Sequence, residues 1–102
     1  MKKVIENGMV AVLVSPDYGG GWYSWHGIPE LLFDPIVVDM VREQQFDNII
    51  DYCRKKYDYD SFYGGAYSLQ VVMVPVGSKF QIHEYDGFET LVFEKDQKWL
   101  EA

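Results

Sequence analysis

Four segments of the chain have the polar and apolar pattern of β-strands, and the first of them is apolar at every position. Residues 9–14 form a continuous apolar run rich in β-branched side chains, with Asn7-Gly8 before it and Ser15-Pro16 after it. Such a run is typical of a strand that is buried on both faces. We therefore expect residues 9–14 to lie centrally in a β-sheet.

The other three strands are predicted in the last third of the chain. Residues 69–74 are apolar and β-branched, and residues 79–85 and 88–93 alternate between apolar and polar positions. The dipeptide Asp86-Gly87 separates the last two segments. Because Asp-Gly between alternating strands is a strong signal for a two-residue turn, we expect these two segments to form a β-hairpin.

The hairpin turn also predicts which side chains face one another. With a two-residue turn, Glu84 faces Glu89 at the end of the hairpin. The expected core side of the hairpin carries four apolar residues, Phe80, Ile82, Leu91 and Phe93. The two glutamates end this same face, and like charges in directly opposed positions destabilise a sheet. We expect a basic side chain, a cation, solvent or a ligand to offset their repulsion.

The middle of the chain predicts helix, with one break. Asp34 is a suitable N-cap and Pro35 suits the first helical turn. Apolar residues recur at helical spacing in residues 36–41 and again in residues 46–57, but the step between the two sets changes the phase. Two short helices, or one kinked helix, fit this pattern better than one straight helix. The whole pattern predicts a single α+β domain over residues 1–102, with a mostly antiparallel four-stranded sheet and two short helices on one face.

Residues 15–27 are predicted to be a loop, and their composition is unusual. The loop holds three consecutive glycines, Gly20 being the middle one, and five aromatic or imidazole side chains: Tyr18, Trp22, Tyr23, Trp25 and His26. It matches neither the P-loop pattern nor the dinucleotide-binding fingerprint. Two interpretations stay open. The loop is either an aromatic site that stacks a flat ligand or inserts into a partner, or a turn whose Trp22 and Trp25 fold back into the core.

The hairpin turn carries the second candidate site. Glu84, Asp86 and Glu89 lie close together in the expected hairpin, with His83 on the opposite face. A carboxylate pair can act as general acid and base or bind a hard cation. Exposed, solvated carboxylates at the end of a sheet are the ordinary alternative.

The composition predicts a folded and acidic domain. Of the 102 residues, 48% are hydrophobic and 17% aromatic, which argues against disorder. Sixteen acidic residues against nine basic ones give a formal charge of −7. This charge disfavours binding to nucleic-acid backbones and to anionic membrane surfaces, and it favours a partner with a basic surface.

The sequence offers little for catalysis or metal binding. Cys53, the only cysteine, lies among the apolar positions of a predicted helix, where a buried and inert thiol is expected. Two histidines without clustered cysteines do not predict a transition-metal site, and no nucleophile motif is present. We expect no catalytic residues, no metal and no cofactor. The N-terminus does not have the pattern of a signal peptide and no apolar run is long enough to cross a bilayer, so we expect a cytoplasmic protein.

Several motifs occur together over most of the chain: residues 15–25, residues 32–35, Gly64-Gly65, residues 77–82, and residues 83–87 followed by Glu89. With its Gly-rich Trp loop and its Glu-Tyr-Asp-Gly hairpin, the chain resembles a family of small bacteriophage proteins of uncharacterised function. Members of that family often have Ser-Thr in place of Tyr23-Ser24 and Asn in place of His26. The resemblance implies phage origin and action in the host cytoplasm. Small phage proteins of this kind often bind and disable host or defence factors.

Two hypotheses about function follow. The first is a phage accessory protein that binds and modulates a host or defence macromolecule through an acidic, aromatic-rich surface. The alternative is a small-molecule or nucleotide-binding protein of the sponge type, which uses the glycine-tryptophan loop; an enzyme is the least supported class, and a homodimer is possible. The residues that we expect to bind a ligand or partner are Tyr18, Gly20, Trp22, Tyr23, Trp25, His26, Glu84, Asp86 and Glu89.

Overall fold

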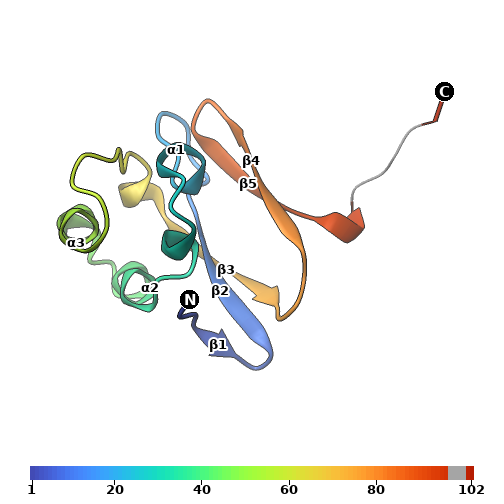
Figure 1. Cartoon of the computed structure of the whole chain (residues 1–102), viewed down its shortest axis with the longest axis horizontal. Coiled ribbons are helices and arrows are strands. Elements are labelled where there is room, and N and C mark those ends of the chain that lie inside the picture. The colour runs from blue at the N-terminus through green and yellow to red at the C-terminus, as the bar shows by residue number, and fades with distance from the viewer. Residues whose placement is uncertain (97–100) are drawn as a thin grey trace.

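The computed structural model describes residues 1–96 and 101–102, and these form an α+β fold (Figure 1). The strands are β1 (Ile5–Glu6), β2 (Met9–Val14), β3 (Gln70–Pro75), β4 (Phe80–Tyr85) and β5 (Phe88–Phe93). The α-helices are α1 (Tyr23–His26), α2 (Pro35–Arg42) and α3 (Ile49–Lys56). Short 3-10 helices lie at Pro29–Leu32, Phe46–Asn48, Ala66–Ser68 and Glu94–Asp96.

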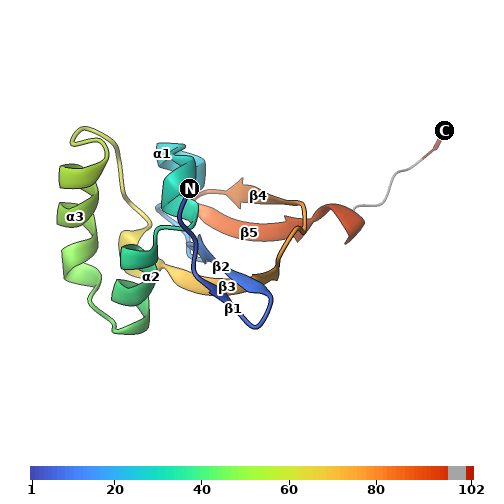
Figure 2. The same ribbon diagram turned by 60° about the horizontal axis from the view of Figure 1, so that its bottom comes forward.

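The strands form two antiparallel sheets, so the prediction of one four-stranded sheet is wrong. One sheet has the order β1-β2-β3, and the other consists of β4 and β5 alone. The two-stranded ribbon lies over a face of the larger sheet instead of extending its edge. Figure 2 shows α2 and α3 on the other side, with α1 near the end of β4. The reason is that β2 is apolar on both faces, and each face needs its own cover.

The two faces of β2 confirm that the apolar run is buried on both sides. Ala11 and Leu13 belong to a helix-side core, which they share with Trp22 and the buried residues of the helices. Val10, Val12 and Val14 belong to a hairpin-side core, against which Phe80, Ile82, Leu91 and Phe93 pack. The core side predicted for the hairpin is therefore confirmed.

The short strand β1 was not predicted. It pairs antiparallel with β2 through a turn at Asn7-Gly8. Both turn residues have positive φ, 51° and 74°. Asn-Gly is a preferred pair for such a two-residue turn. The Asn-Gly pair was visible in the sequence, but β1 has only two residues, too few to show a strand pattern.

The predicted break between two helices is confirmed. Helix α2 ends at Arg42, and Gln44 has a left-handed φ of 58° before α3 begins at Ile49. The predicted N-cap is also confirmed, because the Asp34 carboxylate accepts hydrogen bonds from the backbone N–H groups of Ile36 (2.8 Å) and Val37 (3.2 Å).

Asp34 also connects the two helices. Its second carboxylate oxygen accepts hydrogen bonds from the hydroxyl groups of Tyr52 (2.8 Å) and Tyr57. Burial by itself would raise the pKa of Asp34, but the bonds from the two tyrosines and the backbone outweigh it and hold the pKa below its ordinary value. Nearby, burial raises the pKa of the Cys53 thiol to about 12, as expected for an inert cysteine.

The hairpin has the predicted register. Tyr85 faces Phe88 and Glu84 faces Glu89. The turn residues Asp86 and Gly87 have φ values of 50° and 87°, which a two-residue turn of this kind requires. None of the helices among the described residues has the length and apolar character needed to cross a membrane.

Candidate functional site

Residues 15–22 lie between the hairpin turn and residues 64–68, at the upper end of the molecule in Figure 1. Backbone hydrogen bonds join the three segments. The N–H of Gly19 donates to the carbonyl of Asp86 (2.9 Å) on one side, and the N–H of Gly65 donates to the carbonyl of Gly21 (3.0 Å) on the other. The loop is therefore the middle layer of three.

Glycine is required here because the three backbones approach closely. A Cβ atom on Gly20 would lie 2.6 Å from the carbonyl oxygen of Gly64, and one on Gly87 would lie 2.5 Å from the nitrogen of Gly20. Neither distance is tolerated between non-bonded atoms. The glycines therefore let this loop pack tightly between its two neighbouring segments. The single helical turn α1, where only loop was expected, begins directly after it at Tyr23.

The carboxylate of Glu89 holds the loop from inside. Its side chain is only 1% exposed. One oxygen accepts from the N–H of Ser15 (3.0 Å). The other accepts from the N–H groups of Trp22 and Ser24 (2.9 Å each) and from the Ser24 hydroxyl (2.5 Å). Hydrogen bonds to an ionised group are the strong ones, and they stabilise this buried charge without a basic side chain.

The two opposed glutamates thus have different environments. Glu84 is exposed, and its side chain accepts a hydrogen bond from the N–H of Gly87 at 3.0 Å. Backbone amides were not among the groups that we expected to offset the repulsion, since the sequence pattern pointed to a cation, a basic side chain, solvent or a ligand. Because its oxygens are buried and bonded to the loop, Glu89 presents no surface to a ligand.

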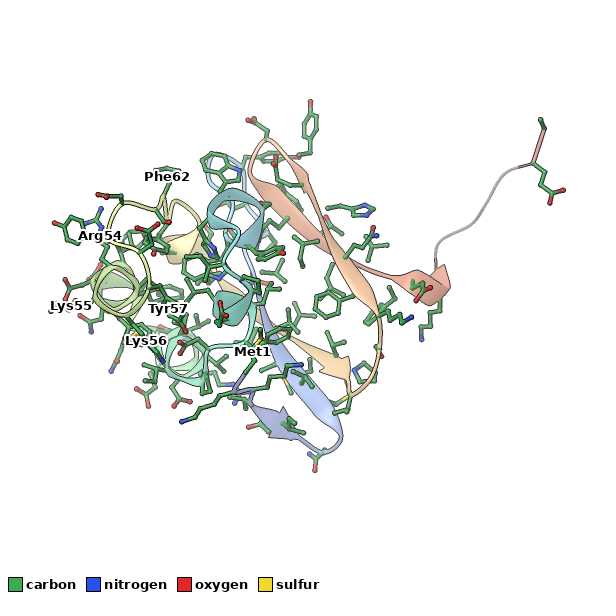
Figure 3. All side chains as sticks on the ribbon, in the orientation of Figure 1. Met1, Arg54, Lys55, Lys56, Tyr57 and Phe62 are labelled. Carbon is green, nitrogen blue, oxygen red and sulfur yellow. The ribbon has the colours of Figure 1, made fainter. Side chains whose placement is uncertain are left out.

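The two tryptophans of the loop differ in the same way. Trp22 is fully buried in the helix-side core, and its indole N–H donates to the carbonyl of Leu31 at 2.8 Å. Trp25 on α1 is 41% exposed and stacks on Phe62, with ring centroids 5.2 Å apart and planes inclined by 27°. Phe62, labelled in Figure 3, is itself 59% exposed. One tryptophan is core and the other is surface.

Two further exposed aromatic residues, Tyr18 and Tyr85, lie at the hairpin turn. Tyr18 is 63% exposed and contacts the ring of Phe88 at 5.1 Å between centroids, and Tyr85 is 77% exposed. We call Tyr18, Trp25, Phe62 and Tyr85 the aromatic end. Phe62 was missed because it follows the helices in a polar segment that the sequence marks only as a loop.

Three exposed carboxylates accompany the aromatic end. Glu84 and Asp86 belong to the hairpin, and Asp17 precedes Tyr18. The Asp17 side chain contacts the Ser68 hydroxyl at 3.4 Å, which joins the loop to the third layer. The acidic character expected of Glu84 and Asp86 is thus present at the surface.

His26 is partly buried among aromatic rings. Its Nδ1 accepts from the N–H of Ile28 (2.9 Å), and the Trp22 ring lies edge-on at 4.7 Å. Its Nε2 is buried and has no hydrogen-bond partner within residues 1–96 or 101–102. Burial lowers the pKa of this imidazole from 6.5 to about 4. His26 is therefore neutral at physiological pH and belongs to the support of α1.

Two cavities touch the predicted site residues. A shallow cavity of about 150 Å³ lies beside the hairpin turn, lined by Tyr18, His83, Glu84, Tyr85, Phe88 and Thr90. It is smaller than the roughly 300–1,000 Å³ that small-molecule sites usually have. Tyr23 lines a different cavity, of about 410 Å³, beside β4. Within the part of the chain that the structure describes, no three His, Cys, Asp or Glu side chains are grouped so that they could hold a metal ion.

The chain was compared with protein-family models, with curated proteins and with solved structures, and none of the three comparisons gave a match. The geometry of the aromatic end therefore carries the functional argument.

Proposed function

We propose that this protein binds a basic surface of another protein through its aromatic end and acts by occupying that surface. The observation that carries this proposal is the exposure of Tyr18, Trp25, Phe62 and Tyr85 on one closely packed support. Aromatic side chains supply much of the energy of protein interfaces. A support that is already ordered reduces the entropy lost on binding.

The charge distribution indicates the kind of partner. Asp17, Glu84 and Asp86 are exposed beside the aromatic rings, and the whole chain carries a formal charge of −7. A basic surface would be attracted to this end at long range and oriented by it. The resemblance to bacteriophage proteins extends the proposal: the partner is a host or defence macromolecule that the protein modulates.

A small-molecule function has less support. It depended on stacking against Trp22 or Trp25 and on polar contacts from Glu84 and Glu89. Trp22 is inside the core and Glu89 is fully engaged by the loop, so neither presents surface to a ligand. Of the two tryptophans, Trp25 stays accessible to a flat molecule, and it stacks on Phe62.

The test is partner capture by surface variants. Trp25→Ala and Phe62→Ala should each reduce capture of a basic partner from host lysate, and the affinity of the purified partner should fall about tenfold or more. Binding should also weaken with added salt, because exposed charges are screened. The matched control is Tyr59→Ala, which removes an exposed aromatic that lies against Arg54 instead.

Trp22→Ala is not a suitable probe, since it would leave a cavity in the core and unfold the support. Equal losses for Tyr59→Ala and Trp25→Ala would contradict the proposal. A thermal shift with one member of a nucleotide panel, lost in Trp25→Ala, would instead support the small-molecule function.

A further inference from the structure

Along the outer edge of β4, alternate backbone groups have no hydrogen-bond partner among residues 1–96 and 101–102. In an antiparallel hairpin, hydrogen-bonded and non-hydrogen-bonded pairs alternate. The two-residue turn makes Tyr85 and Phe88 a hydrogen-bonded pair, and the bond from the N–H of Glu94 to the carbonyl of Lys79 (3.0 Å) continues the alternation at the other end. Between these two positions, every second residue of β4 forms a non-hydrogen-bonded pair. The N–H and C=O groups of Phe80, Ile82 and Glu84 therefore point away from β5.

The opposite strand confirms this direction. Glu89 is the partner of Glu84 in a non-hydrogen-bonded pair, and its N–H points off the far side of β5 to the carbonyl of Ser15 (2.9 Å). By the same geometry the N–H and C=O of Glu84 point off β4. Over residues 1–96 and 101–102, no backbone hydrogen bond joins Phe80, Ile82 or Glu84 to another strand or loop.

Three of the features by which proteins usually protect an open strand, proline, a bulge and a very short strand, are absent from β4. Helix α1 packs against β4 and supplies Tyr23 to the groove beside it, and Glu84 is the one charged side chain within the strand. Strand β4 has six residues, contains no proline and pairs with β5 in a continuous register. In Figure 2 it forms the margin of the two-stranded ribbon. An open edge of this kind is a template for a further strand.

An apolar groove runs beside the open edge. The cavity of about 410 Å³ is lined by Tyr23, Leu32, Phe80, Gln81 and Ile82. Successive side chains of a strand point to opposite faces, so every second side chain of an added strand would enter this groove. The groove therefore selects apolar residues at alternate positions.

The negative charge of the protein favours basic residues at the remaining positions. Glu84 ends the groove face of β4, Asp86 is exposed in the turn beside it, and the whole chain is strongly acidic. A second copy of the chain would bring a like charge of −7 to the same edge, whereas a cationic segment is attracted. We propose that the edge of β4 binds an extended peptide segment with alternating apolar and basic residues, which pairs with β4 as a further strand.

The proposal can be tested with a short end-capped peptide that alternates Val and Lys. Binding should slow hydrogen exchange of the Phe80, Ile82 and Glu84 amides by about tenfold or more, because these N–H groups become paired. The amides of Gln81 and His83, which belong to the β4–β5 ladder, should keep their rates. A peptide with Glu in place of Lys is the charge control and should not bind.

Backbone methylation of the peptide separates strand pairing from simple adhesion. Alternate N–H groups of a strand point to the same side, so a peptide N-methylated at its Val positions and one methylated at its Lys positions present opposite edges. One form should bind and the other should not. Equal binding of the two forms, or no slowed exchange with the parent peptide, would overturn the proposal.

Substitutions of single residues can show whether the peptide binds beside β4 or at the aromatic end. Tyr23→Ala should weaken peptide binding about tenfold through the groove. His83→Ala, on the other face of β4, and Trp25→Ala should leave it unchanged. Equal loss in Trp25→Ala would assign the peptide to the aromatic end and overturn the site at β4. Concentration-dependent protection of the same amides without peptide would show that a second copy is the occupant, and would overturn the peptide.

Discussion

At the scale of single residues, the buried Glu89 determines the conformation of the loop that precedes α1. Its carboxylate accepts hydrogen bonds from the backbone N–H groups of Ser15, Trp22 and Ser24, and the first two belong to fully buried residues that would otherwise lack an acceptor. Unsatisfied buried donors are costly. The charge and the loop therefore stabilise each other.

Glu89→Gln should lower the free energy of unfolding by about 2 to 3 kcal/mol. The NH2 group of the glutamine side chain would replace one carboxylate oxygen and would face backbone N–H groups that need an acceptor. Urea unfolding measures this loss. Glu84→Gln is the matched control: its exposed side chain keeps an oxygen for the N–H of Gly87, so a change within about 0.5 kcal/mol is expected. Equal effects of the two substitutions would show that Glu89 has no special environment.

His26 predicts a dependence of stability on pH. Its pKa is about 4 in the folded protein against an ordinary value of 6.5. Between these values the unfolded chain binds more protons than the folded one, so stability rises with pH over this window and is lost as the pH falls from about 6.5 to 4. Protonation at Nδ1 would also turn a donor toward the N–H of Ile28.

His26→Gln should remove much of this slope, about 1 to 2 kcal/mol after allowance for partial exposure. The measurement is urea unfolding at several pH values, with His83→Gln as the control for an exposed imidazole. Asp34 does not interfere, since its lowered pKa contributes stability that is lost only as the pH falls below about 4. A slope that persists in His26→Gln would contradict this assignment.

Local features of the sequence predicted single residues well where the cause was local. The cap at Asp34 and the turn at Asp86-Gly87 depend on neighbouring residues only. The environment of Glu89 does not: its acceptor role joins it to backbone groups 65 to 74 positions away. Because every residue except proline carries such an N–H, no residue type in the loop marks this contact.

At the scale of elements, three segments fit together through glycines. Gly20 and Gly87 bring the loop against the hairpin turn, and Gly65 brings the third segment against the loop. Gly20 and Gly87 contact backbone atoms, which cannot move aside as a side chain can, and Gly65 contacts the Ser15 side chain as well as the Gly21 backbone. The periodicity of the strands could be predicted from the sequence, but this stacking could not, since a glycine in a turn and a glycine in a contact look the same.

Gly20→Ala should destabilise the fold by about 1 to 3 kcal/mol through overpacking against Gly64. It should also speed hydrogen exchange of the Gly19 and Gly65 amides, which join the layers. The control is Gly8→Ala, which has strained φ (+74°) but no atom within 4 Å of the added carbon. If Gly8→Ala speeds exchange at Gly65 equally, the effect is global and the close approach is not its cause.

At the scale of the whole molecule, β2 belongs to both cores. Its alternate side chains face the helices and the hairpin, so neither layer has a complete core without it. The sequence predicted that both faces of this strand are buried. It also predicted, wrongly, that the hairpin belongs to the same sheet, whereas the hairpin covers the second face of β2. Which element covers the second face depends on the connection after β3, and a turn of a few residues permits either arrangement.

The shared strand predicts that both layers unfold together. Val12→Ala, in the hairpin-side core, should lower the urea midpoint measured by tryptophan fluorescence as much as that measured by circular dichroism. The chain has three tryptophans, and Trp22 lies in the other core, so its share of the fluorescence reports the helix side. Separate transitions by the two methods would show that the layers are independent.

The hydrogen bonds of Glu89 have a consequence for the order of events during synthesis. The ribosome releases residues 15–24 well before Glu89, so their N–H groups meet water at first and lack their final acceptor. Helices α2 and α3 are local and can form earlier. The loop that supports Trp25 takes its final shape only after β5 has emerged. A nascent chain that stops before β5 would therefore display its aromatic residues without the framework that orders them.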